Sequence, residues 1–112
     1  MASDATVYQN SDVTLQFTIY SDTLETTVRD LTSYGTPVYR VGSLATDSTT
    51  LEVNGSISDA VNGIIQVTLT AAQTGGLSPG KYNHQLTVTD NSGNDDVVTD
   101  GYLTVKESLP DV

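Results

Sequence analysis

Residues 13–20 alternate apolar and polar side chains without a break, and this pattern constrains the fold more than any other feature of the chain. A period of two places successive side chains on opposite faces of an extended strand, so that one face is buried and the other is wet. The same alternation returns at residues 65–70 and 85–89, with threonine or glutamine in the outward positions. The pattern predicts a protein built from half-buried β-strands.

Turn residues divide the chain into short segments. The predicted strands cover residues 6–9, 12–20, 37–44, 51–53, 64–70, 81–90 and 96–106. Asn54-Gly55 is the strongest signal for a two-residue hairpin, residues 91–94 form the tip of another, and residues 71–74 allow only a single helical turn. About seven short strands without a helix of normal length predict an all-β fold, an Ig-like antiparallel β-sandwich.

A chain of 112 residues has the ordinary size of one domain. We therefore expect a single domain over residues 1–112, with short terminal arms at residues 1–5 and 107–112. Phe17 is the only phenylalanine and is expected near the centre of the core. Because the chain has no cysteine, it can form neither a disulfide nor a thiolate metal site.

The chain carries 14 acidic residues against four lysines and arginines, which gives a net charge of −10. Such a charge repels phosphate backbones and anionic lipid headgroups, so nucleic acid and membranes are not expected as partners. Two explanations of the charge stay open. It is either a solvated surface that keeps the protein soluble, or a docking surface for a basic partner.

The sequence offers few groups for catalysis. His84 is the only histidine, and by alternation it shares the buried face of its strand with Leu86 and Val88. A general base needs a nucleophile and an orienting group, and no motif of the Gly-x-Ser-x-Gly kind supplies them. We therefore expect a structural histidine in the core or at its rim, no enzymatic activity and no cofactor.

The sequence also contains residues that could bind calcium or carbohydrate. The acidic and amide side chains of residues 90–96 concentrate oxygen ligands of the kind that calcium takes, but Gly93 comes fourth, where an EF-hand has its glycine sixth, so a hairpin turn is favoured. The six tyrosines could stack on sugar rings, but they are dispersed along the chain. A carbohydrate-binding adhesion module therefore stays an alternative function.

Five short motifs follow one another in a fixed order: Asp30-Leu31-Thr32, residues 62–74, residues 77–82, residues 90–93 and residues 101–105. In this order and spacing they resemble the small Ig-like domains of tailed-bacteriophage virion proteins, the nearest type being the N-terminal domain of phage baseplate upper proteins. The resemblance covers about residues 6–106.

The resemblance implies a non-enzymatic structural protein of the virion, made in the host cytoplasm. The shortness of the chain favours a capsid decoration or cement protein, which binds the outer surface of the assembled head and stabilises it. Its partner would be the major capsid protein or another virion protein, with a homo-oligomer on the particle as a further possibility. A tail, neck or baseplate component is the alternative.

Partner contacts are expected on the terminal arms and on the outward half of the strand at residues 13–20. Free termini and edge strands are the parts of a sandwich that join another chain by strand addition. The candidate partner-binding residues are Met1, Ala2, Ser3, Asp4, Ala5, Thr14, Gln16, Thr18, Glu107, Ser108, Leu109 and Pro110.

Overall fold

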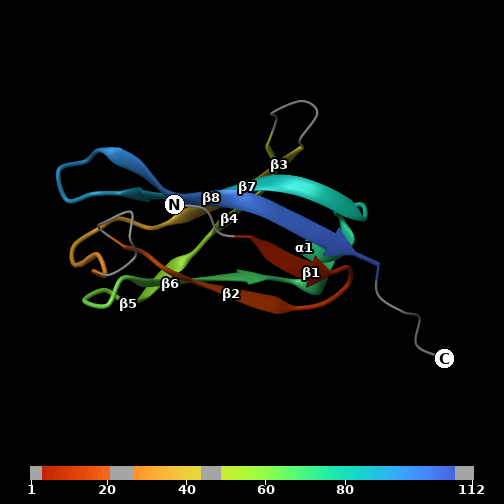
Figure 1. Cartoon of the computed structure of the whole chain (residues 1–112), viewed down its shortest axis with the longest axis horizontal. Coiled ribbons are helices and arrows are strands. Elements are labelled where there is room, and N and C mark those ends of the chain that lie inside the picture. Colours follow the sequence, from red (N-terminus) through yellow and green to blue (C-terminus); the bar gives the residue numbers. More distant parts are fainter. Residues whose placement is uncertain (1–3, 21–26, 44–48, 108–112) are drawn as a thin grey trace.

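The computed structural model describes residues 4–20, 27–43 and 49–107, which form two facing β-sheets (Figure 1). The large sheet has the order β1-β8-β7-β3-β4 and the small sheet the order β2-β6-β5. The elements are β1 (Ala5–Tyr8), β2 (Val13–Thr18), β3 (Val38–Ser43), β4 (Thr49–Asn54), β5 (Ser56–Asp59), β6 (Ile64–Leu69), α1 (Ala71–Gly75), β7 (Gly80–Thr89) and β8 (Asp95–Lys106). The predicted Ig-like β-sandwich is confirmed, with eight strands in the described residues.

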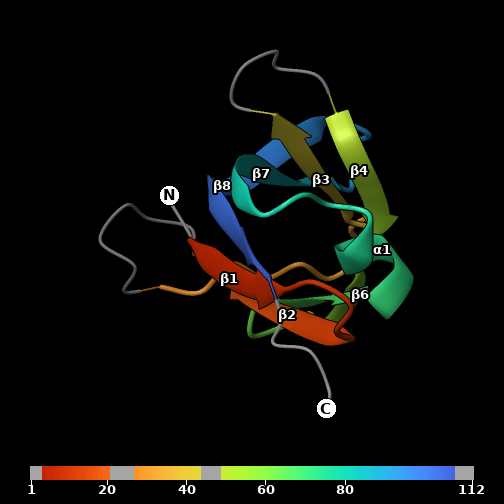
Figure 2. The ribbon, with the colours of Figure 1, turned by 90° about the vertical axis from the view of Figure 1, so that its right-hand side faces the viewer.

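One strand pair is not antiparallel, in contrast to the prediction. β1 runs parallel to β8, with Ala5 opposite Leu103 and Tyr8 opposite Lys106. The chain then turns through residues 9–12 into β2, which belongs to the other sheet, so β1 and β2 lie side by side at one edge of the sandwich (Figures 1 and 2). Alternation of side chains assigns faces but does not reveal strand direction, because parallel and antiparallel strands share the same period of two.

The prediction of a hairpin at Asn54-Gly55 is wrong. β4 pairs with β3 in the large sheet, whereas β5 pairs with β6 in the small sheet, so this dipeptide carries the chain from one sheet to the other. Neither residue has the positive φ that a type I′ turn needs. Gly55 instead passes close to β6, where an added Cβ would lie 3.0 Å from the Gln66 carbonyl oxygen.

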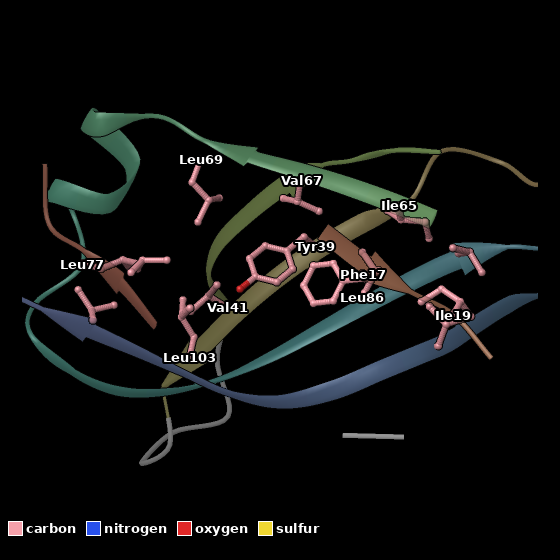
Figure 3. Packing of buried hydrophobic residues seen from close by; sticks show 14 of the residues in the cluster. Phe17, Ile19, Tyr39, Val41, Ile65, Val67, Leu69, Leu77, Leu86 and Leu103 are labelled. Atoms are coloured by element: carbon pink, nitrogen blue, oxygen red, sulfur yellow. The ribbon is translucent and has the colours of Figure 1, made fainter. Parts of the chain in front are cut away.

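The core lies between the two sheets and is formed by the inward halves of their strands (Figure 3). Phe17 of β2 faces Tyr39 of β3 and His84 of β7, with ring centroids 6.0 and 6.1 Å away, respectively. Tyr39 and His84 in turn meet edge to face at 5.5 Å. The three rings join the sheets across the centre of the sandwich, as predicted for Phe17.

One end of the sandwich is closed by α1, which is a single turn as predicted. Thr70 caps its N-terminus, where its side chain accepts from the N–H of Gln73 and the Gln73 side chain accepts from the N–H of Thr70. The fully buried hydroxyl of Thr74 donates to the Ser11 carbonyl at 2.9 Å and accepts from the Ser11 N–H at 3.0 Å. These contacts hold the turn between β1 and β2 against α1.

Candidate functional site

The candidate site is the outer face of the small sheet. β2 pairs with β6 over six residues without a register shift, which places Thr14 opposite Thr68 and Gln16 opposite Gln66. The inward side chains of β6 are fully buried, so the alternate side chains point to solvent. We call this surface the Thr/Gln face, formed by Thr14, Gln16, Thr18, Ser56, Ile64, Gln66 and Thr68.

Cross-strand contacts order the polar side chains of this face. The hydroxyl oxygens of Thr14 and Thr68 lie 3.2 Å apart. One position further along the pair, Nε2 of Gln66 donates to Oε1 of Gln16 at 3.4 Å. Such pairs each contribute a few tenths of a kcal/mol up to about 1 kcal/mol to a sheet. The face is therefore a regular polar surface that offers hydroxyl and amide groups to a partner.

The seven residues of the Thr/Gln face are uncharged, although the chain has a net charge of −10, but Asp59 of β5 lies opposite Ile64 at the margin of the face. The outer face of the large sheet differs, because there Arg40 pairs with Glu52 at 2.9 Å and the ammonium of Lys81 lies 4.1 Å from the centre of the Tyr102 ring. Burying a charged group without a partner costs far more than burying a hydroxyl or an amide that finds a hydrogen bond. The β2–β6 part of the small sheet is thus a surface that a protein partner can cover at a low desolvation cost.

The structure confirms that the predicted strand residues face outward. Thr14 and Gln16 are exposed and Thr18 is half-exposed. The other residues of the face, on β5 and β6, were not among the predicted partner-binding residues. The threonine and glutamine at the outward positions of residues 65–70 were visible in the sequence, but nothing there showed that this strand lies beside β2.

Asp4 and Ala5, which were expected in an N-terminal arm, contact the large sheet instead. Ala5 is the first residue of β1, and the carboxylate of Asp4 accepts from the Tyr102 N–H at 3.0 Å. Glu107 is exposed and directly follows β8. Because β1 and β8 are parallel, the chain enters β1 at the opposite end of that pair from where it leaves β8. Met1, Ala2, Ser3, Ser108, Leu109 and Pro110 lie outside the described residues.

His84 belongs to the core, as predicted. Its side chain is buried, and Nδ1 lies 2.8 Å from the hydroxyl of Tyr39. Burial raises the pKa of the Tyr39 phenol above its ordinary value, so this hydroxyl stays protonated at neutral pH. The pair satisfies two polar groups inside an apolar core, which is a structural role.

Residues 90–94 form a hairpin turn in which Asp90 has a structural task. Its carboxylate accepts from the backbone N–H groups of Ser92 and Asn94, both at 2.9 Å. The next two carboxylates have separate partners, since Asp95 accepts from the Thr89 hydroxyl and Asp96 pairs with Arg29 at 2.8 Å. In the part of the chain that the structure describes, no three acidic or histidine side chains gather as metal ligands would.

The six tyrosines do not share one surface. Tyr39 is buried, whereas Tyr8 and Tyr102 are 51% and 43% exposed. The Lys81 ammonium covers the Tyr102 ring, and the hydroxyl of Tyr82 donates to the Ser78 carbonyl. A hollow of about 300 Å³ is lined by only one of them, Tyr34, together with Gly35, Thr36, Pro37, Gly55, Ser56 and Ile57. A stacking platform for sugar rings would need several exposed rings side by side.

No family model and no curated protein matches this chain. Among solved structures, the chain is similar to fibronectin(III)-like modules of Clostridium thermocellum CbhA, with a TM-score of 0.51 and 9% identity over 97% of this chain and 93% of that one. It is also similar to murine CRIg, with a TM-score of 0.47 and 15% identity over 95% of this chain and 92% of that one. At these identities the likeness concerns the fold. Within the described residues, no helix is long and apolar enough to span a membrane.

Proposed function

We propose that this chain is a non-enzymatic structural protein of a tailed-bacteriophage virion, and that it decorates the outer surface of the assembled head. The Ig-like and fibronectin-like folds typically serve as structural or adhesion modules. The order of the five sequence motifs between residues 30 and 105 is what directs the proposal to a virion.

The uncharged Thr/Gln face carries the docking part of the proposal. A decoration protein must cover part of its surface with the major capsid protein, and the β2–β6 pair offers a regular surface without charged side chains. The partner would supply hydrogen bonds to the hydroxyl and amide groups, since polar groups left unpaired in an interface weaken binding. The acidic residues elsewhere would stay in solvent.

A weak single contact is enough for this role. The occupancy of each site on a capsid depends on the free protein concentration relative to Kd, so a modest affinity per site still covers the particle when the protein is abundant. Any ligand that binds only the assembled state shifts the equilibrium towards that state, so bound copies would stabilise the head. We expect heads that lack the protein to burst at a lower temperature than decorated heads.

The amount of this chain in purified particles tests the proposal. A decoration protein should be present in numbers comparable with the major capsid protein, measured by quantitative gel or mass spectrometry of whole virions. The alternative, a tail, neck or baseplate component, predicts only a few copies per particle. Absence of the chain from purified virions would contradict both virion roles.

A further inference from the structure

The outer edge of β2 has no partner strand among the described residues, because β2 is the first strand of the small sheet and pairs only with β6. The Ile19 N–H donates to the Gly63 carbonyl at 2.8 Å, on the β6 side. Backbone groups of successive residues point to opposite sides of a strand, so those of Phe17 and Leu15 also face β6. The N–H and C=O groups of Thr14, Gln16 and Thr18 therefore point to the open edge.

β2 lacks the features that protect other edge strands from pairing. Natural edges are blocked by charged side chains, proline, bulges or very short length. β1 has only four residues, β4 carries Glu52 and a register shift against β3, and β5 has a register shift next to Asp59. β2 has six uncharged residues in unbroken register with β6.

Apolar surface also stays open along this edge. Val13 and Leu15 point inward and pack against the core, yet both are only partly buried, whereas Ile65, Val67 and Leu69 of neighbouring β6 are fully buried. A strand added beside β2 would cover these two side chains. The edge thus combines free backbone groups with apolar side chains that a neighbour would bury.

We propose that two copies of this chain pair antiparallel through β2, with a two-fold axis at Gln16. The strand reads Thr-Leu-Gln-Phe-Thr over residues 14–18, a chemical palindrome about Gln16. In this register Thr14 lies opposite Thr18 of the second copy, Gln16 opposite Gln16, and Leu15 opposite Phe17. All three are pairs of matched side chains, which is the arrangement that stabilises antiparallel sheets.

The same register also agrees with the direction of the backbone groups on β2 and with the row of side chains on the Thr/Gln face. The even-numbered residues would form the hydrogen-bonded pairs, because their N–H and C=O groups are those that point to the open edge. The hydrogen bond from Gln66 to Gln16 would extend into a row of four glutamines across the six strands of the joined sheet. No charged side chain lies on either β2 strand, so the local contact avoids the repulsion between two chains of charge −10.

Single cysteines test the register directly, since the natural chain has none. Hydrogen-bonded antiparallel residues have Cα atoms about 5.5 Å apart, and their Cβ atoms are farther apart than the roughly 3.5–4.5 Å of a disulfide, so a short bifunctional thiol reagent is the suitable probe. Gln16→Cys should therefore form a covalent dimer rapidly with such a reagent. Thr14→Cys and Thr18→Cys should do so poorly when alone, because each would lie about 13 Å along the strand from its own copy. A mixture of these two variants should cross-link well.

The distribution of cross-linked products decides the proposal. Equal, slow cross-linking by all three variants and by the mixture would overturn it, since random collisions do not distinguish registers.

A sedimentation series on the unmodified chain provides a second readout. Dimerisation should strengthen from about 0.1 M to about 1 M salt, as the Debye length falls from about 10 to 3 Å and the repulsion is screened. A chain that stays monomeric at high concentration and high salt would also overturn it. The outcome does not depend on the virion role, which is tested on particles.

Discussion

The hydroxyl of Tyr39 on β3 lies 2.8 Å from Nδ1 of His84 on β7, in the middle of the apolar core. Both residues are buried, and the ring of Phe17 from the small sheet packs against each of them. The only histidine of the chain therefore joins neighbouring strands of one sheet and contacts the facing sheet. This relationship makes the core sensitive to any change in the charge of Tyr39.

We predict that the protein loses stability above about pH 10, the ordinary pKa of tyrosine. Burial raises the pKa of Tyr39, so the folded state holds its proton where the unfolded state has lost it. The contribution of Tyr39 to the free energy of unfolding is complete below its pKa in the unfolded state. It decreases as pH rises through that value towards the pKa of Tyr39 in the folded state. Tyr39→Phe should lower stability by roughly 1–2 kcal/mol at neutral pH through the lost hydrogen bond. The denaturation midpoint of Tyr39→Phe should then fall less steeply at alkaline pH than that of the natural chain. Identical slopes for both proteins would contradict this.

Gly63→Ala should destabilise the fold more than Gly93→Ala does. Both glycines have positive φ, at 69° and 86°, but they differ in their surroundings. A Cβ on Gly63 would lie 2.6 Å from the Arg29 carbonyl oxygen and 2.7 Å from that of Ile19, whereas nothing lies within 4 Å of a Cβ on Gly93. We expect a loss of about 1–2 kcal/mol at Gly93 from backbone strain alone and a clearly larger one at Gly63. Urea denaturation measures both, and equal losses would refute the close approach at Gly63.

Thr74→Val should cost about 1–3 kcal/mol, because it leaves the backbone N–H and C=O of Ser11 without the hydroxyl that now satisfies them. The shape of the side chain is retained, so the loss reports the hydrogen bonds. Thr68→Val is the matched control on an exposed position, and its effect should stay within about 0.5 kcal/mol. A neutral Thr74→Val variant would show that α1 is held by other contacts.

Asp90→Ala should weaken the β7–β8 hairpin by about 1–2 kcal/mol, since two backbone N–H groups lose their acceptor. Asp90→Asn retains an acceptor oxygen and should behave nearly like the natural chain. Calcium at millimolar concentration should leave the melting temperature of the natural chain unchanged. A calcium-dependent rise that Asp90→Ala abolishes would instead identify this turn as a metal site.

The sequence was sufficient to predict which face of a strand is buried, but not which strands lie beside one another. Alternation correctly placed Phe17 inside and Thr14 outside, because a period of two has direct geometric meaning. The pairing of β2 with β6 and the parallel pairing of β1 depend on contacts between distant segments, which alternation does not encode. The Thr/Gln face spans three strands, of which β2 is far in sequence from β5 and β6, so only its β2 residues could be predicted.

The residues behind the family resemblance are mostly structural. Leu31 is fully buried, Gly63 adopts a backbone conformation that favours glycine, and Leu103 and Val105 lie in the core. The Asp30 carboxylate accepts hydrogen bonds from Thr32, which lowers the pKa of that carboxyl and closes a local turn. Such motifs identify a fold, and they do not locate the surface that acts. The docking surface that we propose was inferred from the sheet pairing instead.

Binding of two matched glutamate variants to isolated heads tests whether the protein docks on the capsid through the Thr/Gln face. Gln66→Glu adds one negative charge to the middle of the Thr/Gln face, and Gln85→Glu adds the same charge to an exposed position on the outer face of the large sheet. In co-sedimentation with undecorated heads, docking through this face predicts much weaker binding for Gln66→Glu and nearly natural binding for Gln85→Glu, because only the first charge would be buried. Equal binding by both variants, or a loss confined to Gln85→Glu, would contradict it.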